Sequence, residues 1–161
     1  AWHAEGIGAD EVDAGRGDTE FRSVLFWVNL ARKDKDVEPR ALVLRHDQIL
    51  VRKEGNATAR ILVGEGSPVQ LGTPASILDA ELPEGGNTIL SVPLEFQGFV
   101  YMLEGSAAFG TSRRRAHVPQ LVLLGQGDEL AVTDAAAGTR FMLMAGKPYG
   151  ETPHFNGPFV D

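Results

Sequence analysis

Residues 99–105 read FVYMLEG and residues 124–130 read LGQGDEL, so each run joins an apolar segment to turn-forming residues. Apolar runs of this length, bounded by Gly, Pro, Asn or Asp, are typical of short β-strands joined by tight turns. Apolar segments and turn-forming residues also follow one another on both sides of these two runs. No stretch keeps the 3.6-residue period of an amphipathic helix. This pattern predicts an all-β fold of the sandwich or barrel type, with little helix.

Short apolar runs mark where the strands are expected. Turn residues separate them, as in PEGG at 83–86 and in EGNAT at 54–58, where Asn56 belongs to an Asn-x-Thr sequon that we interpret as a turn. The expected strands lie at 24–30, 41–44, 48–51, 60–63, 76–78, 88–90, 98–103, 120–124, 129–132 and 140–144.

Composition limits the functions open to the chain. Its 161 residues suggest one domain, or one domain with part of another. A net charge of −7 argues against direct nucleic-acid binding, and the basic cluster at 113–115 is expected at a solvated hairpin tip. The absence of cysteine excludes disulfides, thiolate ligands and cysteine nucleophiles, and no apolar run approaches the roughly 20 residues of a membrane span. We therefore expect a cytoplasmic protein without membrane contact.

The order of motifs between residues 75 and 145 resembles a cupin. Cupins carry a Y-x-L-E-G hairpin at the end of their first motif, and YMLEG stands at 101–105. Their second motif opens with G-x-G-D, and GQGD stands at 125–128. The resemblance implies a double-stranded β-helix, which is a jelly-roll barrel.

A further set of motifs covers nearly the whole chain. They are WHAE at 2–5, FWVNL at 26–30, KDK at 33–35, VEPR at 37–40, GTP at 72–74, AGKP at 145–148 and NGPFV at 156–160. In this order they resemble pirins, a family of tandem cupins. The resemblance implies three parts: residues 1–31 as the C-terminal remnant of an N-terminal metal cupin, 32–45 as a linker, and 46–161 as a complete, metal-free C-terminal cupin.

His3 and Glu5 are the candidate metal ligands. On a strand, residues two apart point to the same face, and imidazole with carboxylate suits a non-haem Fe(II) or similar site. Pirins carry an H-x-E at this place, so the resemblance makes His3 a metal ligand and Glu5 a ligand, a catalytic base, or both. The earlier H-x-H pair of a pirin's first cupin has no counterpart here, so the site is incomplete. The alternative is an incidental His and Glu near a terminus.

The second cupin offers poor metal ligands. When it is aligned on residues 101–105, the usual ligand positions fall on Ser91, Pro93 and Gln97, with the late histidine position near Arg140. Proline has no side-chain donor atom and arginine is a permanent cation, so a metal-free barrel is expected. Its interior should be filled by Ile89, Phe99, Tyr101, Leu103, Leu121, Leu123, Phe141 and Leu143.

The resemblance leaves different functional classes open. The first is an Fe(II)-dependent dioxygenase of the quercetin 2,3-dioxygenase type, acting on a flavonol-like molecule when the N-terminal cupin is complete. The second is a non-enzymatic, metal- and redox-dependent regulator that binds a transcription factor or a metabolic enzyme. A folded remnant without either activity is the third. We expect this chain by itself to be inactive, and exposed apolar surface around 24–30 to favour a dimer or a partner chain.

Overall fold

The computed structural model describes residues 23–152 and two short strands, Phe155–Asn156 and Phe159–Val160. Within these residues all regular structure is β, apart from the 3₁₀ turns η1 (Arg32–Asp34) and η2 (His46–Gln48). The prediction of an all-β chain is confirmed. None of the described residues forms a helix that is long and apolar enough to cross a membrane.

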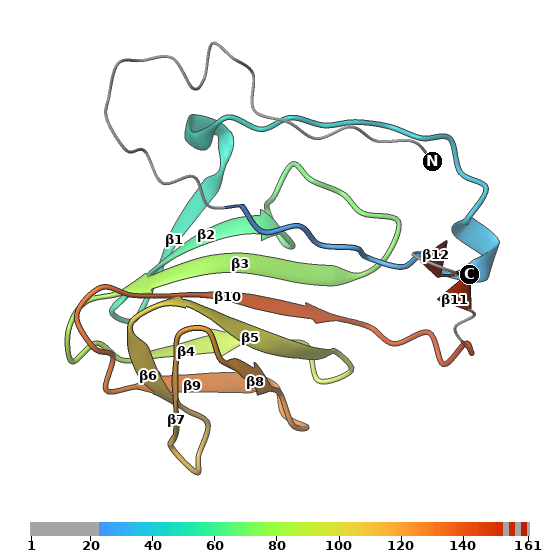
Figure 1. Ribbon diagram of the computed structural model, residues 1–161. Helices are drawn as coiled ribbons and strands as arrows, with labels where there is room; N and C mark the ends of the chain where they lie inside the picture. Colours follow the sequence, from blue (N-terminus) through green and yellow to red (C-terminus); the bar gives the residue numbers. More distant parts are fainter. Residues whose placement is uncertain (1–22, 153–154, 157–158, 161) are drawn as a thin grey trace.

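Two antiparallel sheets face one another and enclose the core (Figure 1). The larger sheet has six strands, and its spatial order is β1 (Leu50–Glu54), β2 (Ala57–Val63), β3 (Ala75–Leu82), β10 (Thr139–Gly146), β5 (Gln97–Glu104) and β8 (Leu121–Leu123). The smaller sheet has four strands, in the order β4 (Thr88–Ser91), β9 (Glu129–Thr133), β6 (Ser106–Phe109) and β7 (Arg114–His117). A separate pair joins β11 (Phe155–Asn156) to β12 (Phe159–Val160).

Most of the expected strands are present, with two exceptions near the start. Residues 24–30 and 41–44 form no strand; they belong to an extended segment, 23–45, that contains η1. Strand β6 was not expected, because its sequence SAAF has low β-propensity and is held by pairing on both sides. The basic cluster at 113–115 does lie at an exposed hairpin, with Arg113 in the turn between β6 and β7 and Arg114 and Arg115 at the start of β7. The domain boundaries at 31–32 and 45–46 stay predictions.

The interior between the sheets is apolar and closely packed. Phe141 and Leu143 of β10 are fully buried there, and the ring of Phe109 meets that of Phe141 edge-on at 5.5 Å between centroids. Several alanines on β2, β3 and β6 bring the two layers close together. The other large interior side chains are Leu78, Leu82, Leu90, Val100, Met102, Leu130 and Val132.

The prediction of which side chains fill the barrel interior is confirmed for β10 and wrong for the other strands. On β5 the interior is filled by Val100 and Met102, whereas Phe99, Tyr101 and Leu103 pack on the outer face of the larger sheet. Ile89 and Leu123 are exposed, at 56% and 77%, and Leu121 is half exposed. The run at 98–103 is apolar at every position because both faces of β5 are covered, so alternation could not reveal which face points inward.

Candidate functional site

The outer face of the larger sheet carries a second apolar layer. Alternation along β3 and β10 places Ile77, Met142 and Met144 on this face, and all three are buried. Phe26, from the segment before the first strand, packs against them. We call this set, with Val63 and the outward side chains of β5, the outer apolar layer. A sheet with apolar side chains on both faces needs a covering on each.

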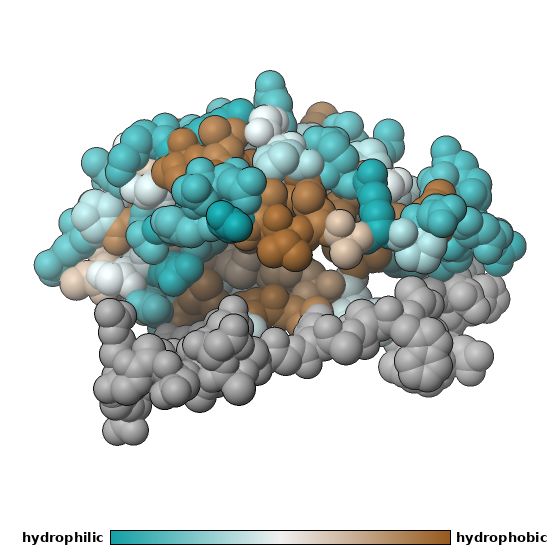
Figure 2. Space-filling view, turned by 90° about the horizontal axis from the view of Figure 1, so that it is seen from above, coloured by the Kyte–Doolittle hydropathy of each residue, from teal (hydrophilic) through white to brown (hydrophobic). Residues whose placement is uncertain are grey.

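A groove opens where residues 25–29 cross this layer. Its volume is about 620 Å³, and it lies between that segment and the strand ends that contain Ile77, Phe99 and Met144. Leu25 and Trp27 on its rim are 57% and 58% exposed. Figure 2 looks onto the side of the molecule where this segment runs and shows hydrophobic side chains gathered in its centre, bordered by hydrophilic ones. We call this feature the outer groove.

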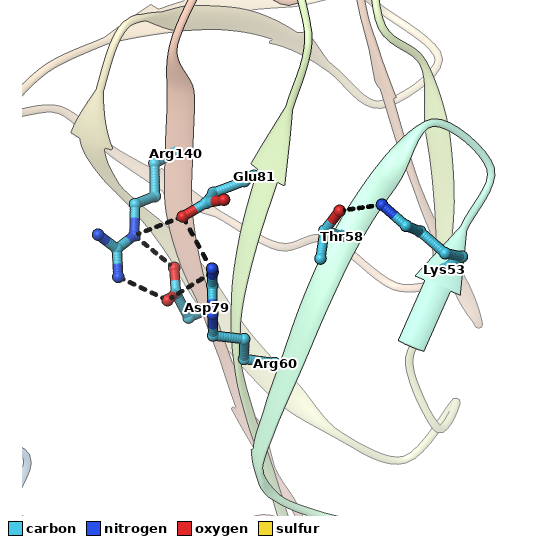
Figure 3. A network of polar contacts seen from close by, with 6 residues as sticks. All are labelled: Lys53, Thr58, Arg60, Asp79, Glu81 and Arg140. Carbon is cyan, nitrogen blue, oxygen red and sulfur yellow. Dashed lines mark hydrogen bonds and ion pairs between the residues drawn. The ribbon is translucent and has the colours of Figure 1, made fainter. Parts of the chain in front are cut away.

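An ion cluster lies on the same face, beyond Phe26 (Figure 3). Asp79, only 5% exposed, accepts hydrogen bonds from Nε and Nη2 of Arg140 at 2.8 and 2.7 Å. Arg60 donates to Glu81 at 2.9 Å and lies 3.5 Å from Asp79. Because Arg60 comes from β2, the two acids from β3 and Arg140 from β10, the cluster ties three neighbouring strands together.

The electrostatics of the ion cluster favour the charged form of Arg140. The pKa of Arg140 is raised above its ordinary value, first by its hydrogen bonds to Asp79 and then by the negative charges of Asp79, Glu81 and Glu104, while burial works against this rise. A guanidinium whose pKa is raised cannot act as a proton donor near neutral pH. Arg140 therefore acts as a clamp between strands and not as a general acid.

In the second cupin, the residues that align with the usual cupin metal ligands do not lie close together. Ser91 and Pro93 are exposed at the end of β4, and Gln97 lines the outer groove. Arg140 lies on the outer face of the sheet, held by Asp79. Across residues 23–152, no group of three or more His, Cys, Asp or Glu side chains could hold a metal ion. The described residues therefore do not fit a metal site.

His3 and Glu5 lie outside the described residues. Their roles as a metal ligand and as a ligand or base stay predictions, as does the identity of the metal. The ion cluster, in contrast, was not predicted from the sequence. Its signal was available in β3, where Asp79 and Glu81 stand two residues apart in an otherwise apolar strand and so share one face.

Comparison with known proteins places this architecture in a family. Residues 77–161 match the family described as the Pirin C-terminal cupin domain. This chain belongs to the pirin family. A pirin-like protein from Solanum lycopersicum is 34% identical over 96% of this chain and 55% of its own length. Human pirin is 26% identical over 99% of this chain and 57% of its own.

A solved structure gives the same fold. The crystal structure of quercetin 2,3-dioxygenase from Acinetobacter baumannii superposes with a TM-score of 0.75 and 25% sequence identity, covering 83% of this pirin-family chain and 48% of that one. The chain thus spans about half the length of the curated relatives that it matches. The predicted family and the predicted cupin fold are both confirmed.

Proposed function

We propose that this chain is the scaffold cupin of a pirin-type protein, and that a two-cupin protein containing it is an Fe(II)-dependent dioxygenase of the quercetin 2,3-dioxygenase type. The similarity to the Acinetobacter enzyme carries the proposal. In it, metal chemistry on a flavonol-like substrate belongs to the other cupin, where His3 is a ligand and Glu5 a ligand, a base, or both. The proposal is supported by the lack of any group of three or more His, Cys, Asp or Glu side chains able to hold a metal ion among the described residues.

The outer groove gives this chain its own task in that protein. A face that carries Leu25, Trp27 and a buried methionine layer favours contact with another apolar surface over contact with water. We assign this face to docking of the other cupin, since residues 25–29, which belong to the predicted remnant of that cupin at 1–31, already cross it, and the chain spans about half the length of its relatives. In this role the second barrel holds the first in place without supplying a catalytic residue.

The test is quercetin turnover after anaerobic loading with Fe(II). A two-cupin protein that contains this chain should consume quercetin, and the 161-residue chain treated in the same way should not. Turnover by the short chain would place the chemistry inside the described barrel and contradict the proposal. Absence of turnover by an iron-loaded two-cupin protein would reject the dioxygenase and leave the scaffold role standing.

The outer groove also favours a second candidate function, a metal- and redox-dependent regulator that binds a protein. Tryptophan is a frequent anchor of protein interfaces, and Trp27 on the groove rim is 58% exposed. A net charge of −7 suits a protein partner better than DNA. The partner in this proposal is a transcription factor or a metabolic enzyme, and a second copy of the chain would use the same face.

Matched leucine variants test whether the groove binds a protein. Leu25→Ser should weaken binding to a defined partner by about tenfold, because one buried leucine contact is lost. If the partner is a second copy of the chain, self-association measured by light scattering should weaken by the same factor. Leu123→Ser removes a leucine that is exposed outside the groove and should change neither. Binding should also differ between reducing and oxidising conditions for the iron-loaded two-cupin protein. Equal effects of the two variants, or equal binding in both conditions, would reject the regulator.

A further inference from the structure

The cupin barrel is closed at one end by hydrogen bonds between turns. Asn56 donates its backbone N–H to Asn87 at 3.0 Å, and Gly85 donates to Ala135 at 2.8 Å. Thr139 Oγ1 donates to the carbonyl of Ser106 at 2.8 Å. These turns gather at the left end of the barrel in Figure 1.

The opposite end is hollow. Cavities of about 380 and 340 Å³ open at the two seams between the sheets, and the ring of Phe96 borders both of them. The first lies between the edge strands β1 and β4, and we call it the barrel-mouth cavity. Its floor is apolar and its volume falls within the range of small-molecule sites. The floor is formed by Ala59, Ile61, Leu78, Leu90 and Phe96.

Arg52 gives this cavity its polar wall. It lies on β1 opposite Ala59, whose small side chain leaves room beside the guanidinium. One of its nitrogens, Nη2, donates to the backbone carbonyl of Glu65 at 2.9 Å, and the ion pairs of the described residues do not include Arg52. The remaining N–H groups of the fork are therefore available for an anion.

The loop after β2 fixes the guanidinium in this place. Gly66 has a φ of +84°, and a Cβ there would lie 3.1 Å from Arg52 Nη2 and 2.8 Å from Leu50 Cδ2. This positive φ favours glycine, because L side chains rarely adopt it. The hydrogen bond from Arg52 to the carbonyl of Glu65 orients the guanidinium before any ligand arrives, which reduces the entropy lost on binding.

Glu54 adds a hydrogen-bond acceptor near Arg52. It stands two residues along β1, on the same face as Arg52, and also lines the cavity. Its carboxylate can accept a hydrogen bond from a hydroxyl and disfavours a second negative charge on a ligand. One cation beside one acceptor therefore suits a ligand with one carboxylate and one hydroxyl.

We propose that the barrel-mouth cavity binds a small aromatic monocarboxylate that carries a hydroxyl group, with its carboxylate on Arg52, its hydroxyl on Glu54 and its ring against Leu90 and Phe96. The site does not depend on the proposed function, because it uses no metal and no residue of the outer groove. It would give this barrel a ligand of its own.

A titration with matched probes tests the site on the unaltered chain. The probe is 4-hydroxyphenylacetate, followed by ¹H–¹⁵N NMR, with a dissociation constant on the order of 1 mM expected for a ligand this small. 4-Hydroxyphenylacetamide and tyramine keep the ring but lack the carboxylate, and 4-methylphenylacetate lacks the hydroxyl. All three should bind at least about tenfold more weakly, since a hydrogen bond to a charged group provides roughly that factor. Amide shifts should centre on residues 52–61 and 90–96.

Paired arginine variants locate the carboxylate. Arg52→Met should weaken binding of 4-hydroxyphenylacetate by about tenfold, whereas Arg114→Met, which alters the neighbouring cavity, should leave it unchanged. Equal binding of tyramine, no saturable shift at tens of millimolar, shifts centred on the outer groove, or equal effects of the two variants would each overturn the proposal. The probe series needs no variant, so it decides the matter even if Arg52→Met unfolds.

Discussion

At the scale of single residues, Asp79 is the side chain on which the ion cluster depends. Its replacement by alanine leaves Arg60 and Arg140 facing each other without the carboxylate that both approach. Because both arginines are partly exposed, the full penalty for breaking a buried pair must be discounted for screening. We expect Asp79→Ala to lower the free energy of unfolding by about 2–3 kcal/mol. Urea denaturation at neutral pH measures this loss of free energy of unfolding.

The matched control is Glu81→Gln in the same strand. Its side chain is far more exposed than that of Asp79, and Arg60 can still approach Asp79, so a loss below about 1 kcal/mol is expected. If Asp79→Ala were as mild as this control, the cluster would be an ordinary surface network and not a clamp across the sheet.

Gly98 is the residue at which β5 comes closest to β10. A Cβ at this position would collide with the carbonyl oxygen of Met144 and lie 2.7 Å from Ala145 Cα. Since these are backbone atoms of a paired strand, they cannot move aside without breaking the ladder. Gly98→Ala should lower the free energy of unfolding by about 3 kcal/mol or more, as overpacking of a core does at its upper range. Thermal unfolding measures the loss.

Gly125→Ala is the control for Gly98→Ala. An added Cβ at Gly125 would meet no atom within 4 Å, and its backbone φ lies outside the left-handed region. A change within about 0.5 kcal/mol is expected for such a surface position. Similar melting temperatures for the two variants would mean that β5 and β10 are not paired in this register.

At the scale of elements, neighbouring residues of β4 test which face of a strand points inward. Leu90 is 2% exposed and Ile89 is 56% exposed, although the two are adjacent and similar in volume. Leu90→Ala should cost about 2–4 kcal/mol through the cavity that it leaves, and Ile89→Ala less than about 1 kcal/mol. Chemical denaturation of both gives the comparison. The reverse order would restore the interior that the sequence predicted.

The positions of the strands could be predicted more reliably than the face that each strand turns toward the interior. Short apolar runs between Gly, Pro, Asn and Asp located most strands, because turn residues mark where a chain must reverse. In β5 both faces are apolar, so alternation could not show which face points inward. The apolar run at 24–30 resembled a strand, but it forms none, and its Phe26 packs on the outer apolar layer.

The candidate sites were harder to predict than the strands. Alignment on the hairpin at 101–105 placed Ser91, Pro93 and Gln97 as a set, yet the structure puts Gln97 at the outer groove and the other two at the barrel mouth. The ion cluster joins residues up to 80 positions apart in sequence, from Arg60 to Arg140. Such contacts follow from strand order, which local patterns do not encode.

At the scale of the whole molecule, the two proposed binding sites, the outer groove and the barrel-mouth cavity, lie on separate surfaces. The groove lies outside the larger sheet, where Phe26 and Met144 form its wall, and it suits a large apolar partner. The cavity lies between the sheets, where Arg52 stands over an apolar floor, and it suits a small acid. The two proposed roles therefore use separate surfaces of the barrel, and each can be tested without the other.

The final prediction concerns the metal content of the 161-residue chain. Four histidines are spread along it and no H-x-H is present, and the described residues contain no cluster that could hold a metal. Two missing nitrogen ligands should weaken a site at His3 and Glu5 by several kcal/mol, on the scale of known metal-site energies. We expect Fe(II) or Ni(II) to be lost on dialysis, as elemental analysis can measure, and His3→Ala to leave the melting temperature unchanged. Tight, stoichiometric iron that survives dialysis would mean that ligands are shared between copies of the chain or lie elsewhere in it, and the assignment of the metal to another cupin would then be wrong.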